Sequence, residues 1–120
     1  MIANGQNEAA RNLIEQLSGV YPGRLYIELQ RHGMPVEEQT ETAFLDLAYA
    51  LDLPIVATND VLFEHEGFYE AQDALTCIAD GTYVTQQNRR RTTREHRFKS
   101  AKEMRLLFAD LPEAVDNTLV

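Results

Sequence analysis

Two short apolar segments with a single helical pattern between them limit the folds open to this chain. Residues 25–30, "LYIELQ", and residues 54–58, "PIVAT", are rich in β-branched and aromatic side chains, which is typical of strands. Between them, residues 36–51 repeat apolar side chains at helical spacing. The order strand, helix, strand predicts two parallel strands joined by a right-handed crossover. We therefore predict an α/β fold.

Two longer helical patterns flank this unit. Residues 7–17 have helical period, and Ser18-Gly19 after them predicts a C-terminal stop. Residues 66–79 place further apolar side chains on one helical face, and Gly81 suits the left-handed position that follows many helices. Both segments are therefore predicted to be α-helices.

Two short helices are predicted near the end of the chain from their starting residues. Ser100 with Glu103 has the pattern of a capping box, and Asp110 with Glu113 has a similar one. A parallel sheet normally needs several strands, whereas this chain supplies about two, with about five helices. We therefore expect either pairing with another copy or a piece of a larger α/β protein.

Length and composition favour one globular domain. The chain has 120 residues, of which 44% are hydrophobic and 25% charged, values typical of globular proteins. No apolar run approaches the roughly 20 residues that span a bilayer, and the N-terminus lacks the pattern of a secretory signal. Cys77 is the only cysteine, so no internal disulfide is predicted. We predict a cytoplasmic location and no membrane contact.

The positive charge is concentrated in residues 88–102, "NRRRTTREHRFKSAK". This segment holds seven of the 11 Lys and Arg and one of the 19 acids, so it carries +6 and the remainder carries −14. It lacks helical period and is predicted to be a loop. One hypothesis is a contact with DNA phosphates or with a partner, through Arg89, Arg90, Arg91 and Arg94. The alternative is a solvated loop or an intramolecular partner for the acidic remainder.

Polar residues follow both predicted strands. His32 follows the first strand and Asp60 follows the second, and the carboxyl ends of parallel strands lie at one edge of a sheet. Histidine with aspartate is a usable pair of metal ligands, although a catalytic zinc usually needs three protein ligands. The alternatives are a solvated surface role for His32 and a turn-forming role for Asp60. No P-loop, dinucleotide fingerprint or nucleophile motif is present.

Four segments carry a resemblance to a known family. The segments "LYIELQRHG", "LPIVATNDV", "AQDALTCIADG" and "FKSAKEMRLLFADLPEAVDNT" together resemble the bacterial DNA polymerase III alpha-subunit family. They are similar to the second half of its polymerase-and-histidinol-phosphatase (PHP) domain and to the stretch just past it. The resemblance implies a partial β/α barrel, seven-stranded when intact. Residues 1–87 would be the C-terminal part of that barrel, and residues 88–120 a basic loop with short helices.

The resemblance also implies a degenerate metal site. His32 matches a metal-binding histidine of the family, and Asp60 matches the first residue of an Asp-x-His motif. Leu62 stands where the histidine of that motif would be, and its side chain offers no lone pair to a metal. Losing one ligand weakens binding and removes the geometry that activates water. The implied role is therefore a structural or docking module of a replicative polymerase, without catalysis of its own.

The resemblance further implies cofactors and partners. No cofactor is expected in this segment; magnesium would serve the polymerase site of the parent protein, and zinc or manganese an intact PHP site. Expected partners are the rest of the alpha subunit, a proofreading subunit, other replicase subunits, and DNA through the parent. Self-association of the truncated segment is also expected. Two alternatives stay open: a metal-dependent phosphoesterase or 3′–5′ exonuclease of the PHP superfamily, and an error-prone paralogue of the polymerase.

Overall fold

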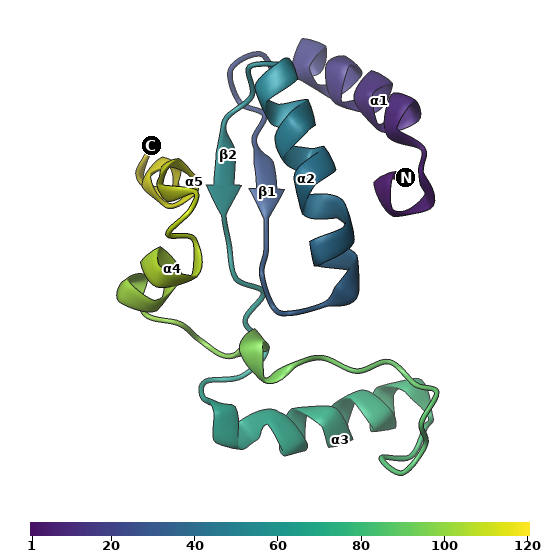
Figure 1. The fold of residues 1–120 in the computed structure, drawn as a ribbon. Coiled ribbons are helices and arrows are strands. Elements are labelled where there is room, and N and C mark those ends of the chain that lie inside the picture. The colour runs from purple at the N-terminus through teal and green to yellow at the C-terminus, as the bar shows by residue number, and fades with distance from the viewer.

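The computed structural model describes residues 1–120 and has a mixed α/β fold (Figure 1). The predicted two parallel strands and five helices are confirmed. The barrel that the resemblance implies stays a prediction. In chain order the elements are α1 (Asn7–Val20), β1 (Ile27–Leu29), α2 (Pro35–Ala50), β2 (Ile55–Ala57), α3 (Tyr69–Asp80), α4 (Ala101–Leu107) and α5 (Pro112–Asp116). Short 3-10 turns occupy Ile2–Asn4, Glu66–Phe68, Arg94–His96 and Asn117–Leu119.

The two strands pair in parallel and bury one face of a small sheet. Ile27 lies opposite Ile55, and Leu29 lies opposite Ala57. All four side chains are buried, whereas Glu28 between them is exposed. This alternation follows from the pleat, because successive side chains of a strand point to opposite faces. The buried face therefore fixes where the core forms.

The core lies between this sheet, α2 and the C-terminal helices. Figure 1 shows α2 beside β1 and α5 beside β2, in agreement with the contacts between these elements. Phe108 is fully buried and is the largest side chain of the core. The core comprises Ile27, Leu29, Ala48, Ile55, Ala57, Phe108, Ala114 and Val115. Residues on both sides of position 87 thus share one core.

The observed helix ends agree with the predicted capping residues at some positions and differ from them at others. Ser100 accepts a hydrogen bond from the Glu103 N–H at 3.3 Å, and the Glu103 carboxylate accepts one from the Ser100 N–H at 2.8 Å, so this capping box is confirmed. Gly81 ends α3 in the left-handed conformation, as predicted. The predicted stop at Ser18-Gly19 is wrong, because α1 continues to Val20.

The predicted start of α5 at Asp110 is also wrong. Leu111 occupies the N-terminal cap position of α5, and it makes no capping bond with its side chain. The Asp110 carboxylate instead accepts two hydrogen bonds from Arg31, at 2.7 and 2.8 Å. A long-range ion pair has therefore replaced the local cap that the sequence pattern indicates.

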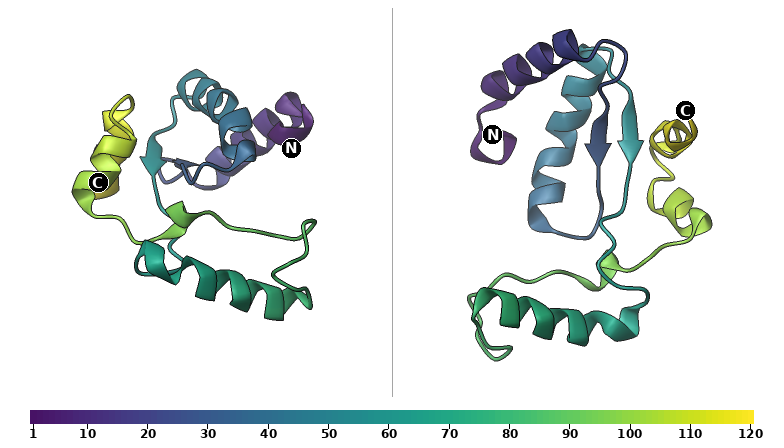
Figure 2. Two further views of the ribbon diagram at one scale, coloured as in Figure 1. Left: turned by 60° about the horizontal axis from the view of Figure 1, so that its bottom comes forward. Right: turned by 180° about the vertical axis from the view of Figure 1, so that it is seen from behind.

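Residues 61–98 form an arm that carries α3 away from the body of the molecule (Figure 1; Figure 2). The body consists of residues 1–60 and 99–120 and contains the whole core. After α3 the chain runs back alongside that helix, and Arg97 forms an isolated parallel β-bridge with Phe63. No helix of the body or the arm combines the length and apolar character that a membrane span requires.

Candidate functional site

His32 lies just after β1 and is buried, with 1% of its surface exposed. Its Nδ1 atom lies 2.8 Å from the carboxylate of Glu37, in the first turn of α2. The other oxygen of that carboxylate accepts the backbone N–H groups of His32 and Met34, at 2.7 and 3.0 Å. The alternative of a solvated His32 is therefore wrong, because Glu37 folds back over the loop and encloses the ring.

Asp60 meets His32 as the parallel strands predict, but through its backbone. The Asp60 N–H donates a hydrogen bond to His32 Nε2 at 3.2 Å. Asp60 is exposed, and its carboxylate accepts no hydrogen bond. The alternative role, in which this carboxylate forms a turn by accepting nearby backbone N–H groups, is therefore wrong. Both ring nitrogens of His32 are consequently engaged by the protein itself, one by Glu37 and one by Asp60.

His96 completes a buried pair of imidazoles. Its ring stacks on His32, with 4.0 Å between ring centroids and an interplanar angle of 18°. The Thr93 hydroxyl donates to the His32 carbonyl at 2.6 Å and so ties the arm to the end of β1. Burial lowers the pKa of His96, and the neighbouring His32 lowers it further. The sequence gives no local signal for this pair, because 64 residues separate its members.

The charge of Glu37 is stabilised by the same loop. Burial acts to raise the pKa of Glu37, but the hydrogen bonds from His32 and Met34 outweigh it, and the pKa lies below its usual value. A carboxylate that accepts several N–H bonds is favoured in its ionised form. Glu37 is therefore an anion that positions His32 and holds the loop after β1 against α2.

The residues at this edge of the sheet do not fit a metal ion as they are arranged. No group of three or more His, Cys, Asp or Glu side chains in the chain is placed to hold one. His32 has no free nitrogen, because Glu37 and Asp60 engage both. Leu62 instead lines an apolar groove of about 310 Å³ with residues of α3. The metal-binding role of His32 and Asp60 stays a prediction from the resemblance.

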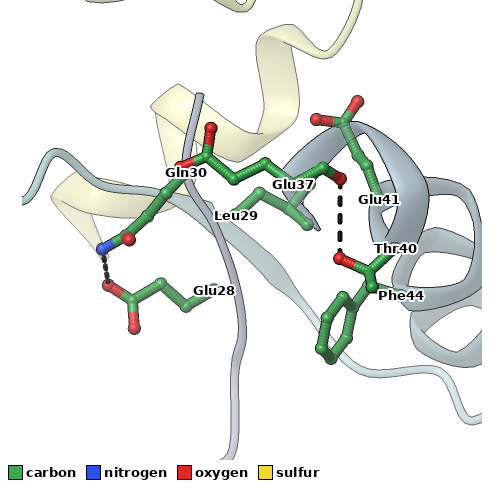
Figure 3. A pocket seen from close by; sticks show the side chains of 7 residues that line it. All are labelled: Glu28, Leu29, Gln30, Glu37, Thr40, Glu41 and Phe44. Atoms are coloured by element: carbon green, nitrogen blue, oxygen red, sulfur yellow. Dashed lines mark hydrogen bonds between the residues drawn. The ribbon is translucent and has the colours of Figure 1, made fainter. Parts of the chain in front are cut away.

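A hollow of about 210 Å³ lies beside this edge, between β1 and α2 (Figure 3). Its lining residues are Glu28, Leu29, Gln30, Glu37, Thr40, Glu41 and Phe44. Its three carboxylates all have partners within the protein. Glu28 bonds Gln30 and Thr58, while Glu37 bonds His32 and Glu41 pairs with Arg31. The hollow therefore presents negative charge without an uncommitted ligand.

Arg31, next to His32, joins three parts of the body. Its guanidinium donates to Glu41 of α2 at 2.6 and 2.8 Å, to Asp110, and to the Leu107 carbonyl at 2.8 Å. It also lies 4.6 Å from the centroid of the Phe108 ring. Hydrogen bonds to Asp110 and then Glu41 raise the pKa of Arg31 further. No local sequence pattern indicates this role of Arg31, since its partners are ten or more residues away.

The four arginines of the predicted DNA contact lie on the arm, and three of them pair with acids of α3 or of the 3-10 turn before it. The Arg89 side chain is 3% exposed and donates to Asp73 at 2.5 and 2.7 Å, and Arg90 donates to Asp80 at 2.9 and 3.0 Å.

Arg94 continues the same pattern. It lies 4.7 Å from the Tyr69 ring centroid and 3.7 Å from Glu66. Arg91 is exposed and donates only to the Gln86 carbonyl, at 3.1 Å. These contacts match the intramolecular alternative for the basic segment better than a free cationic surface.

The fold and site define an α/β chain with a two-stranded parallel sheet and a buried pair of histidines. No protein-family model matches the chain. It is 52% identical to the DNA polymerase III subunit alpha of Caulobacter vibrioides over 119 residues, or 99% of this chain. Identity to the proteins of the same name is 40% in Rickettsia bellii and 36% in Pseudomonas aeruginosa, over 99% and 98% of this chain.

The chain spans about a tenth of the length of these relatives. It is therefore homologous to a segment of the DNA polymerase III alpha subunit, and the resemblance predicted from its four segments is confirmed.

Proposed function

We propose that the chain is a segment of a DNA polymerase III alpha subunit and that it acts there as a structural module. The similarity over 99% of the chain supports the first part. The arrangement of His32 carries the second part, because Glu37 engages one ring nitrogen and the Asp60 N–H the other, which leaves neither free for a metal. Leu62, an apolar side chain in the expected position of a ligand, supports the same role.

In this proposal the activity of the whole protein is DNA-directed DNA synthesis during replication. Magnesium and deoxynucleoside triphosphates would bind in parts of the subunit outside these 120 residues. The segment would lie in the PHP domain and the stretch after it, and its principal partner would be the rest of the alpha subunit. Contacts with a proofreading subunit and with other replicase subunits follow from the same proposal. A cytoplasmic location follows from it as well.

The other functions are less well supported. A phosphoesterase or exonuclease needs a complete metal-binding set, which would have to be completed by residues outside this chain, because its own donors do not form one. The relatives compared carry the name of the alpha subunit, which favours it over an error-prone paralogue. Among the four arginines, a DNA contact would depend mainly on Arg91, because Arg89, Arg90 and Arg94 are engaged by acids of the arm.

The test uses the full-length protein with the substitution Asp60→Asn. Asp60 is exposed, so its replacement leaves the core intact. We expect primer extension to stay within about twofold of the unchanged protein, a change below about 0.5 kcal/mol in activation free energy. We also expect no metal-dependent 3′–5′ nuclease activity that depends on Asp60. Both rates are measured on the same preparation.

Asp46→Asn is the matched control, because Asp46 is an exposed aspartate on α2. A nuclease activity that falls tenfold or more in Asp60→Asn and not in Asp46→Asn would contradict the structural role. A full-length protein without primer extension would contradict the assignment to the polymerase.

A further inference from the structure

Helix α3 exposes its apolar side. Phe68, Leu75 and Ile78 recur at helical spacing, and 47%, 59% and 76% of their surfaces are exposed. Single exposed apolar residues are ordinary, but a continuous apolar stripe on one helix marks an interaction surface. The sequence pattern identified these three residues as one helical face. The structure adds that Leu75 and Ile78 stay exposed and that Phe68 is only partly covered, with the His65 ring against it.

The opposite side of α3 is polar and faces the returning chain. Asp73 binds the buried Arg89 side chain, and the Tyr69 hydroxyl donates to the Thr92 carbonyl at 3.2 Å. Thr76 and Cys77 are buried on the same side. The usual arrangement of a surface helix is therefore reversed, with ion pairs inside and apolar side chains outside. Such a helix has its main packing partner elsewhere.

The arm contains no apolar core that stabilises it alone. None of the eight core residues lies between positions 58 and 107. The arm is tied to the body at its neck, through the stacked rings of His32 and His96 and the hydrogen bond that the Asn59 side chain donates to the Arg97 carbonyl. Because helix stability in proteins comes mostly from packing of an apolar face, α3 requires a surface to pack against.

Leu62 extends the apolar stripe into a groove. With Phe63, Phe68, Ala71 and Leu75 it lines the hollow of about 310 Å³ between the outgoing chain and α3. The residue that removes the expected metal ligand thus adds apolar surface at the start of the arm. We call this groove and the exposed stripe of Phe68, Leu75 and Ile78 the arm face.

We propose that the arm face is an internal docking surface, covered by an apolar surface of the same longer polypeptide outside these 120 residues. This inference rests on the proposed function, because it takes the occupant from the remainder of the alpha subunit. The relatives extend over about ten times the matched length, so they have ample chain to supply it. A face that is apolar at its centre suits a permanent contact better than a transient one.

A second copy of the chain is the less suitable occupant. A two-fold contact brings the same surface of both copies together. The acidic Glu64 lines the groove, so such a contact would set like charges against each other. The chain as a whole is acidic, with a net charge of −8, which opposes the same pairing.

The test measures maleimide labelling of Ile78→Cys in the full-length subunit, read at the residue level by tandem mass spectrometry because Cys77 lies in the same peptide. Each rate is divided by the rate in the denatured subunit. We expect labelling at position 78 to slow at least about tenfold, equivalent to about 1.4 kcal/mol of protection. Leu75→Cys gives an independent second site on the arm face if Ile78→Cys does not fold.

Glu70→Cys is the control, since the Glu70 side chain is 88% exposed and lies away from the stripe. We expect its labelling to stay near the denatured rate. Fast labelling at position 78 would overturn the proposal, and so would slow labelling at both position 78 and position 70. Protection of position 78 that disappears when the subunit is diluted would also overturn it, because it would point to a second copy as the occupant. Primer extension by the same preparations reports on the proposed function separately.

Discussion

Arg31→Ala removes the side chain that holds the C-terminal segment to β1 and α2. The Arg31 side chain is 20% exposed and donates five hydrogen bonds, to Glu41, Asp110 and the Leu107 carbonyl. Breaking a buried ion pair by removing one partner costs roughly 3–5 kcal/mol, whereas an exposed pair contributes roughly 0.2–1 kcal/mol. Asp110 is exposed and can be rehydrated, while Glu41 is largely covered. We therefore expect a loss of about 2–3 kcal/mol.

The assay is urea unfolding of the 120-residue chain at neutral pH, followed by circular dichroism at low protein concentration. The midpoint should fall while the slope of free energy against urea stays the same, because a loss of stability alone leaves the exposed area unchanged. Arg31→Lys should recover only part of the loss, since an ammonium group cannot reproduce the planar fork of donors.

Arg105→Ala is the matched control for this experiment. Arg105 pairs with Asp116 at 2.9 Å, but both side chains are more than half exposed. We expect a change within about 0.5 kcal/mol. A loss in Arg31→Ala no larger than that in Arg105→Ala would refute the reasoning, because burial and multiple bonds would then add nothing.

Two further predictions concern the same body. Phe108→Ala should destabilise the chain by about 3–5 kcal/mol, since Phe108 is fully buried, whereas the exposed Phe98→Ala should cost less than about 1 kcal/mol; equal urea midpoints would contradict the core assignment. Hydrogen bonds from Ser100 and then Arg97 lower the pKa of Glu103 to about 2, against 4.5 ordinarily. The stabilisation is therefore complete above about pH 4.5 and is lost as pH falls toward about 2. Glu103→Gln should flatten this part of the stability profile, and an unchanged profile would refute the cap.

The elements that the sequence predicted correctly are those that local patterns specify. The strands at Ile27–Leu29 and Ile55–Ala57 follow from their composition, and their parallel pairing follows from the helix between them. Gly81 ends α3 as predicted because its left-handed backbone costs a glycine little. Gly19 misled the prediction because α1 continues through it with an ordinary helical backbone.

The site depends on contacts that local patterns cannot reveal. His32 was correctly placed near Asp60, since parallel strands end at one edge, but its burial depends on Glu37 and on the distant His96. The pairing of Arg31 with Asp110 spans 79 residues and replaced a local cap. Such contacts follow from the packing of the body and the arm, so only the three-dimensional structure shows them.

The packing of the arm is a second feature that local sequence patterns could not predict. Periodicity identified the apolar face of α3 but could not show that the returning chain packs on the opposite side. The side of α3 on which the returning chain packs depends on the ion pair of Asp73 with Arg89, 16 residues apart. Charge patterns likewise located the basic segment without showing that its arginines pair with α3.

The central claim is that this segment supports a polymerase without holding a catalytic metal, and metal analysis of the full-length subunit tests it most directly. Zinc and manganese are measured per subunit after extensive dialysis, in the unchanged protein and in Asp60→Asn. We predict the same metal content in both, because His32 is already engaged by Glu37 and the backbone of Asp60. A stoichiometric ion that is present in the unchanged protein and lost in Asp60→Asn would contradict it.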